Sequence, residues 1–285
     1  MGCTNSFIYN SRSYKDVIYT EKSDKRLDRI YLIKSIMTEE AHIIKEIPDE
    51  ISPQIESRVT QIKTKLGPAT SLFVSPIGID DKLTVLKSER LALNGLSKCR
   101  YLKVEFFQRD IADEFNVKAL KQRKFYPFEI WTLIYTLVFA TAELEKNGFK
   151  LNAISFDDIV ITNNSFKYFY LPFFDGVLIQ KVIDELDYDQ MRLNIAFIVL
   201  ETCKEPKFGE LPAFDKKIHT LEHFSQEMES SQCKLEDELR SFVSGVLISN
   251  SPNYRSLWEI GKHLAKLYHS LEYEVVDEEV VKLFS

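Results

Sequence analysis

The chain has 285 residues, of which 45% are hydrophobic and 28% charged, and its net charge is −6. This length suits one large domain or two lobes with a sizeable core. The acidic balance argues against a nucleic-acid-binding domain, because phosphate contacts require a basic surface.

The N-terminal third predicts a small antiparallel sheet. Residues 7–36 contain the short β-prone runs SFIYN, DVIYT and RIYLIKSI, separated by a charged turn. We expect the acidic segment 37–51 to be irregular. Further strand candidates, SLFVSPIGI, KLTVLKS and RYLKVEFF, occur within 71–107.

One helix interrupts these strands. Ser52 and Pro53 suit an N-cap and a first helical residue, and the helix is expected to end at Leu66, before Gly67-Pro68. Spacings of three and four residues place one apolar set on the same helix face: Ile55, Val59, Ile62 and Leu66.

The second half predicts long helices. The polar run 108–124 has the character of a linker, and a long helix is expected from Pro127 to Asn147-Gly148. The stretch 148–172 then predicts a loop, a short strand, a turn and a second strand. Further helices are expected at 187–203, 215–231, 235–249 and 255–270.

This order of elements resembles a protein kinase. YLKVEFFQRDIADEF at 101–115 is similar to the last strand of the N-lobe and the hinge, and FEIWTLIYTLVFATAELEKNGF at 128–149 to the helix before the catalytic loop. DYDQMRLNIAFIVLETCKEPKFG at 187–209 is similar to the central C-lobe helix, which would open with a buried acid at Asp189. LRSFVSGVLISNSPNYRSLWEI at 239–260 is similar to the closing helices, with Arg255 at the position of a structural arginine.

The resemblance implies a fold class of α+β: a bilobal protein-kinase-like fold with a small β-rich N-lobe holding one main helix, and a larger helical C-lobe. The domains would be an acylated segment 1–6, an N-lobe 7–107, a C-lobe 108–270 and an acidic tail 271–285. The tail, YEVVDEEVVKLF, is either a docking or capping segment or a solvated end.

The resemblance also implies that the catalytic groups have been lost. The His-Arg-Asp positions of the catalytic loop fall on Leu151, Asn152 and Ala153, and alanine cannot act as a base. The magnesium-binding Asp-Phe-Gly falls on Tyr170, Leu171 and Pro172. Asp158 occupies the position of the metal-binding asparagine and can in principle still hold a cation.

The other nucleotide-binding parts are also weak. No glycine lies between Gly2 and Gly67 to let the backbone approach phosphates. Lys34, in IYLIK, matches the phosphate-pairing lysine and is the one cofactor-binding candidate, although a strand-ending lysine is more often solvated. Its partner acid would be Glu56, but the spacing places Val59 at that site. We therefore expect no bound cofactor.

Metal and disulfide sites are not indicated. Asp175, the nearest acid downstream of Tyr170, is a poor metal candidate, and His219 and His223 have zinc-compatible spacing but no third ligand. The four cysteines are far apart and form no CxxC pair: Cys3, Cys99, Cys203 and Cys233. The longest apolar run, 130–144, is too short to span a bilayer.

The N-terminus MGCTNS fits the motif for N-myristoylation at Gly2, and Cys3 beside it is placed to accept palmitate. A single acyl chain binds membranes only marginally, whereas two chains anchor durably. The sequence therefore predicts lipidation and a location on the cytoplasmic face of a membrane.

Together these features predict a pseudokinase rather than an enzyme. Its partners would be other proteins and the inner membrane leaflet, with no nucleic acid, and it would act as a scaffold or adaptor. The alternative is a structural component of a cytoskeletal or ciliary assembly that uses the fold as a rigid block. A relocated nucleotide-dependent activity would need a carboxylate pair and a glycine loop, neither of which the sequence offers.

Overall fold

The computed structural model describes most of the chain in two compact units. The described residues are 6–9, 12–20, 30–35, 41–48, 52–74, 76–80, 83–86, 99–105, 107, 109–149, 151–162, 166–168, 186–229, 236–271 and 274–285. Those within Met1–Lys65 and Val74–Phe107 belong to the first unit. Those within Leu66–Phe73, Gln108–Phe169 and Val182–Ser285 belong to the second.

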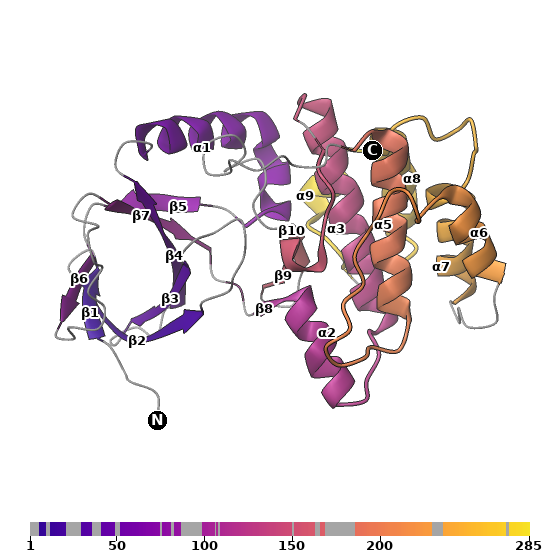
Figure 1. Ribbon diagram of the computed structural model, residues 1–285. Helices are drawn as coiled ribbons and strands as arrows, with labels where there is room; N and C mark the ends of the chain where they lie inside the picture. The colour runs from indigo at the N-terminus through magenta and orange to yellow at the C-terminus, as the bar shows by residue number, and fades with distance from the viewer. Residues whose placement is uncertain are drawn as a thin grey trace. The chain divides into compact units, whose positions relative to one another are not determined.

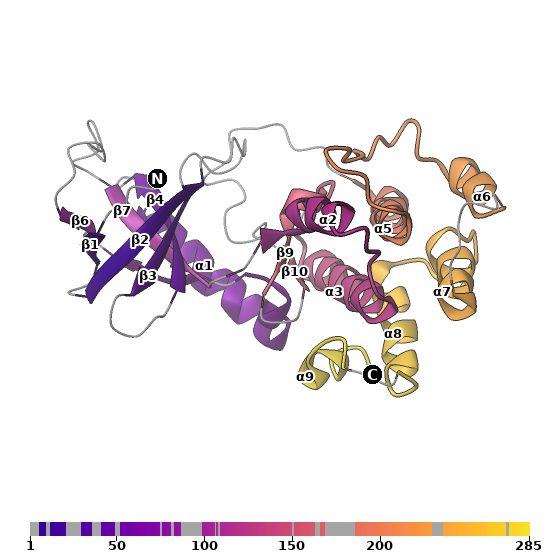
Figure 2. The same ribbon diagram turned by 90° about the horizontal axis from the view of Figure 1, so that it is seen from below.

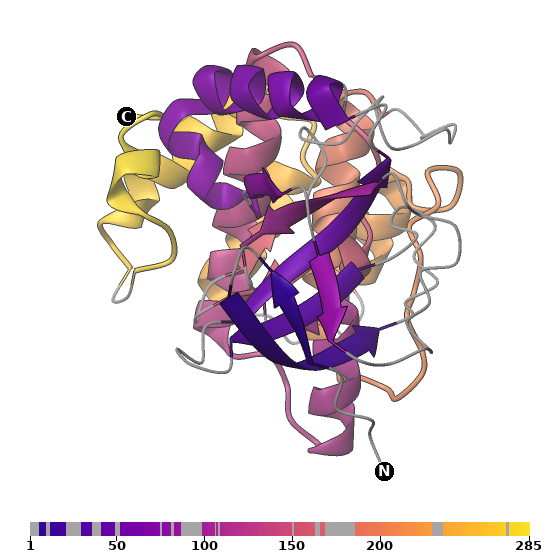
Figure 3. The ribbon, with the colours of Figure 1, turned by 90° about the vertical axis from the view of Figure 1, so that its left-hand side faces the viewer.

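The first unit is built on a seven-stranded antiparallel sheet in the order β5-β7-β4-β3-β2-β1-β6 (Figure 1). Its strands are β1 Ser6–Tyr9, β2 Arg12–Thr20, β3 Ile30–Ser35, β4 Ala41–Pro48, β5 Pro76–Asp80, β6 Leu83–Leu86 and β7 Cys99–Val104. The antiparallel sheet expected from the sequence is therefore confirmed. Figure 3 shows the strands face-on, with the helix α1 along one edge.

Segment 37–51 was wrongly expected to be irregular, because it contains β4. This strand lies inside the sheet, with Ile43 opposite both Leu32 of β3 and Val104 of β7. Hydrogen bonds on both sides hold this strand, which the charged residues within and around it concealed in the sequence. The run at 71–79 also forms a strand only from Pro76 onward.

Helix α1, Ser52–Leu66, has the bounds that its Ser-Pro start and Gly-Pro end predict. Ile55, Ile62 and Leu66 are buried, and Val59 is half-buried. Gly67 has a φ of 51°, which other residues adopt at a cost, so the chain can leave the helix there. A 3₁₀ segment, η1 Gly67–Leu72, follows in the second unit.

The second unit surrounds the central helix α3, Pro127–Lys146, as Figure 2 shows. Every residue of α3 from Ile130 to Leu144 is buried. Its other elements are β8 Arg109–Asp110, α2 Ile111–Leu120, η3 Phe156–Asp158, β9 Ile159–Ile161, β10 Phe166–Tyr168, α5 Tyr188–Cys203, α6 Leu221–Glu229, α7 Asp237–Phe242, η4 Val243–Leu247, α8 Leu257–Tyr268 and α9 Glu278–Val281. The predicted start and end of α3 are confirmed, with Gly148 at a φ of 72° just beyond it.

The polar run 108–124 is not a linker, because most of it forms α2. Asp110 caps this helix by accepting a hydrogen bond from the Asp113 N–H at 2.8 Å. Ile111 and Phe115, one turn apart, are buried and Asp113 is exposed, whereas the Lys118 side chain is buried in an ion pair with Glu129. A narrow apolar stripe therefore stabilises this helix. The polar composition of residues 108–124 concealed that stripe in the sequence.

Two C-terminal helices also differ from the expected ranges. Helix α6 begins only at Leu221, rather than near 215. Helix α7 passes into η4, a π-helical turn, within the range 235–249 that predicted one regular helix. The helices α5 and α8 agree with prediction to within two residues.

The acidic C-terminal end is a docked segment and not a solvated end. Val280, Val281 and Phe284 are buried. The Phe284 ring stacks on Phe139 of α3 with centroids 4.2 Å apart, and it lies 4.4 Å from the Trp258 ring of α8. The charged residues of this segment cover an apolar contact that belongs to the core of the second unit.

Candidate functional site

The candidate site is the loop 151–158, between α3 and the β9–β10 hairpin. Leu151 and Asn152 are buried, and Ala153 is half-buried. The loop is ordered: the Leu151 carbonyl accepts a hydrogen bond from Leu186 N–H at 2.8 Å. Its three positions that match the His-Arg-Asp motif offer no group that can take a proton from a hydroxyl at neutral pH.

A buried amide on α5 anchors this loop. The Asn194 side chain is fully buried, and its Oδ1 accepts a hydrogen bond from Ile154 N–H at 2.7 Å. Its Nδ2 donates to the carbonyl of the same residue at 3.1 Å. Because both partners are backbone groups, the side chain fixes the loop whatever side chains the loop carries.

Asp158 is committed to its own loop. Its Oδ2 accepts hydrogen bonds from the backbone N–H and the hydroxyl of Ser155, both at 2.8 Å, and the side chain is buried. This arrangement is a capping box around η3. The carboxylate at the position of the metal-binding asparagine therefore stabilises the loop.

Aromatic side chains of α2 and α5 pack against the loop. The Phe156 ring lies 5.0 Å from Phe115 of α2 and 6.1 Å from Phe197 of α5. On the hairpin side, the Thr136 hydroxyl of α3 donates to the Phe166 carbonyl of β10 at 3.3 Å. The loop is thus held by α2, α3 and α5 together.

The expectation that Asp189 is a buried acid is wrong. Its side chain is 70% exposed and pairs with Arg192 Nη2 at 3.1 Å. Arg192 is the buried member, and its Nη1 donates to the carbonyls of Val246 and Ser249 at the end of η4. Arg255 is exposed and donates from Nε to the Pro252 carbonyl at 3.1 Å.

No metal centre is formed within the part of the chain that the structure describes. The rings of His219 and His223 lie 5.5 Å apart, edge to face. His219 instead contacts aromatic rings, with its centroid 4.5 Å from that of Phe197 and 5.9 Å from that of Phe224. Burial among these rings lowers the His219 pKa below its usual value of 6.5.

Several predicted site residues lie outside what the structure describes. Gly2, Cys3, Tyr170, Leu171, Pro172 and Asp175 are among them. The Lys34 backbone is paired in β3, opposite Lys15 and Ala41, but its side chain is outside the description. On α1, Glu56 is exposed and Val59 half-buried.

Sequence reasoning missed two residues of the site, and each had a readable signal. Asn194 is the single amide within the apolar run LNIAFIVL, and a polar side chain in such a run needs buried hydrogen-bond partners. Ser155 and Asp158 have the spacing of a capping box. The sequence does not say, however, which backbone segment the Asn194 amide will bind.

Comparison with known proteins gives matches among solved structures. No protein-family model matches the chain. No curated protein does either. Among solved structures, the chain is similar to the PAN3 pseudokinase of Drosophila melanogaster, with a TM-score of 0.54 and 10% sequence identity. The alignment covers 92% of this chain and 66% of that one.

At this identity the similarity establishes the fold alone. The chain has an α+β protein-kinase-like fold, with a β-rich N-terminal unit that contains α1 and a larger helical C-terminal unit. Within the described residues, no helix combines the length and the apolar character needed to cross a membrane.

Proposed function

We propose that the protein is a catalytically inactive kinase-like scaffold that binds other proteins at the cytoplasmic face of a membrane. The observation that carries the proposal is Ala153, in an ordered loop in which Asp158, at the position of the metal-binding asparagine, caps the loop itself. Kinases contribute mainly positioning and charge stabilisation, and both require the missing carboxylates.

The structural neighbour supports this reading, because it is described as a pseudokinase. Asn194 and the aromatic contacts of Phe156 maintain the loop without a catalytic base. A fold that retains its loop anchors but not its reactive groups retains surfaces for binding, and protein partners are the natural ligands of such surfaces.

Acylation of Gly2 and Cys3 would provide the membrane attachment. Myristate on Gly2 gives marginal and reversible binding, and palmitate on Cys3 makes attachment durable. We expect Gly2→Ala to remove both modifications if palmitoylation follows membrane encounter, and Cys3→Ser to leave a weakly bound myristoylated protein.

Membrane flotation with intact mass spectrometry tests the attachment in eukaryotic cells. The wild type should float and carry both acyl masses, and Cys203→Ser is the matched cysteine control because Cys203 lies in α5. An unmodified N-terminus, or equal flotation of Gly2→Ala and wild type, would refute acylation. Release of the protein by detergent is expected; retention in the insoluble cytoskeleton would favour the assembly component instead.

Nucleotide titration tests the absence of a cofactor. We expect no thermal stabilisation by ATP–magnesium at millimolar concentration, because the glycine loop and the metal-binding aspartate are missing from the sequence. Magnesium-dependent stabilisation that is lost in Lys34→Ala would contradict the proposal and indicate nucleotide sensing.

A further inference from the structure

Large apolar side chains are exposed in two segments of the second unit. In the first segment Leu120 is 70% exposed, Tyr126 51% and Phe128 46%. In the second segment, which follows α5, Phe208 is 65% exposed and Leu211 41%. Isolated exposed apolar residues are ordinary, but a group of this size on one surface indicates an interaction site.

Two contacts bring the segments together. The Gly209 N–H donates to Asn116 Oδ1 of α2 at 3.0 Å. Lys124 Nζ lies 3.0 Å from Glu205 Oε1. Segments 120–128 and 205–211 therefore form one surface, which we call the basic apolar surface.

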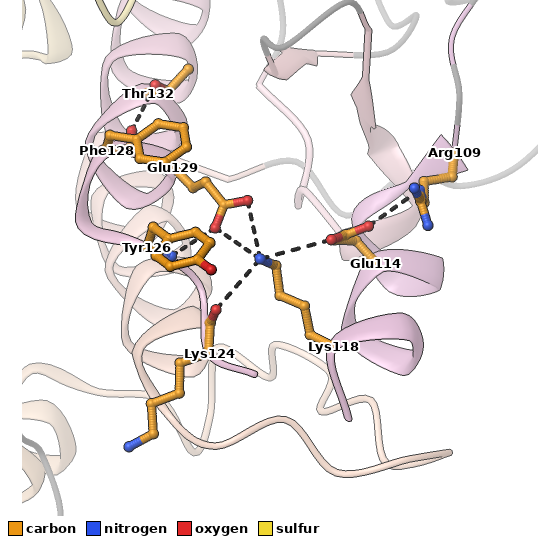
Figure 4. A network of polar contacts seen from close by, with 8 residues as sticks. All are labelled: Arg109, Glu114, Lys118, Lys124, Tyr126, Phe128, Glu129 and Thr132. Carbon is orange, nitrogen blue, oxygen red and sulfur yellow. Dashed lines mark hydrogen bonds and ion pairs between the residues drawn. The ribbon is translucent and has the colours of Figure 1, made fainter. Parts of the chain in front are cut away.

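A buried ionic network fixes the turn that carries the first segment (Figure 4). Lys118 Nζ is 2.8 Å from Glu129 Oε2 of α3 and 3.8 Å from Glu114 Oε1 of α2, and it also donates to the Lys124 carbonyl at 3.4 Å. The network joins the end of α2 to the start of α3. The exposed rings of Tyr126 and Phe128 stack with centroids 5.9 Å apart and are thus held in place before any ligand arrives.

The surface is positively charged although the chain is acidic. Lys121, Arg123 and Lys124 lie in the turn, and no acid occurs between residues 115 and 128. Lys124 is paired with Glu205, and Lys207 with Glu210 at 3.4 Å. Lys121 and Arg123 are exposed and form no ion pair with any acid that the structure describes.

We propose that the basic apolar surface docks on anionic lipid headgroups, so that the folded domain adds its own membrane contact to the N-terminal acyl chains. This inference deepens the proposed function, because it takes the membrane as the place of action. Exposed aromatic and leucine side chains can enter the headgroup region while lysine and arginine pair with lipid phosphates and carboxylates.

The placement of the anchors favours a lipid surface over a protein partner. Leu120 and the stacked aromatic pair lie around one turn, whereas Phe208 lies on a second turn next to Gly209. Side chains on separate turns can enter a deformable lipid surface one by one, whereas a protein partner needs a complementary surface that fits all of them.

Vesicle co-sedimentation of the unacylated full-length chain, made in bacteria, tests the proposal. We expect binding to vesicles of equal parts phosphatidylserine and phosphatidylcholine, weaker binding as salt rises, and little binding to phosphatidylcholine alone. Lys121→Gln with Arg123→Gln should weaken binding about twenty-five-fold, the product of roughly five-fold for each cation. Leu120→Ser with Phe208→Ser should weaken it by about tenfold or more.

Matched variants serve as controls. Lys262→Gln with Lys266→Gln removes the same charge from exposed positions on α8, and Ile218→Ser removes an apolar side chain that is 58% exposed outside the surface. Both should bind like the wild type. Circular dichroism and unfolding midpoints of every variant should match those of the wild type, since all these side chains are exposed.

Absence of wild-type binding to the phosphatidylserine vesicles overturns the proposal. Equal losses in the surface variants and the α8 control also overturn it, because they would report net charge alone. Acylation is absent from this assay, so the failure of lipid docking is separate from the failure of the proposed anchoring, which the mass of the cellular protein reports.

Discussion

Gly261 of α8 lies directly against Phe284 at the C-terminal end of the chain. A Cβ atom placed on Gly261 would be 2.5 Å from a ring carbon of Phe284, which is closer than real contacts allow. The missing side chain thus makes room for the ring that stacks on Phe139. The glycine and the docked C-terminal segment depend on each other.

Gly261→Ala should therefore destabilise the second unit by about 1–3 kcal/mol, because overpacking displaces the Phe284 ring. Urea unfolding measures the change. Gly245→Ala is the control, since a Cβ there meets nothing within 4 Å. The loss in a variant that also carries Phe284→Ala should be smaller than the sum of the two single losses. Equal stability of Gly261→Ala and Gly245→Ala would contradict the close contact.

Removal of the loop anchor should loosen the candidate site. Asn194→Ala deletes two buried hydrogen bonds to Ile154 and leaves its N–H and carbonyl unsatisfied, which is expected to lower stability by about 2–4 kcal/mol. Hydrogen exchange at residues 152–158 should accelerate. Asn253→Ala, which removes an exposed amide, is the control. Unchanged hydrogen exchange in Asn194→Ala would show that the loop is held by other contacts.

Ala153→Asp should not create a kinase. The added carboxylate restores one group, but the position that matches the metal-binding aspartate is Tyr170, and catalytic groups that act as a unit are not additive. Incubation with radiolabelled ATP, magnesium and a generic protein substrate is expected to give no label above that of the wild type. Detectable transfer would mean that a metal site exists elsewhere in the chain.

Protonation of His219 should lower the free energy of unfolding at acidic pH. Burial lowers its pKa from 6.5 in the folded state, so the unfolded chain binds the proton more readily. Stability is therefore retained above pH 6.5 and falls as the pH drops toward the lowered folded value. His219→Gln keeps an acceptor for the Asp215 N–H, which donates to His219 Nδ1 at 2.9 Å.

Unfolding by urea at about pH 7 and about pH 5 measures this effect. The wild type should lose more stability between these values than His219→Gln does. His269→Gln is the comparison, since His269 is exposed just beyond α8. The same pH dependence in wild type and His219→Gln would contradict the assignment.

The kinase-like order of elements could be predicted because its strongest signals are local. Ser52-Pro53 and Gly67-Pro68 delimit α1, and Pro127 and Gly148 delimit α3. Each signal acts through the backbone conformation of its own residues, so it can be recognised without knowledge of distant contacts. The identity of Ala153, and with it the expected loss of the base, also follows from the sequence alone.

Local signals in the sequence thus predicted the ends of α1, α3, α5 and α8, most strands and the chemical groups that the loop lacks. Contacts between distant segments, by contrast, make β4 a strand paired on both sides, 111–120 a helix and Phe284 a docked residue. The same contacts bury Asn194 and Arg192 in α5 and leave Asp189 exposed. These outcomes depend on burial and on pairing between segments distant in sequence, and local propensity contains neither.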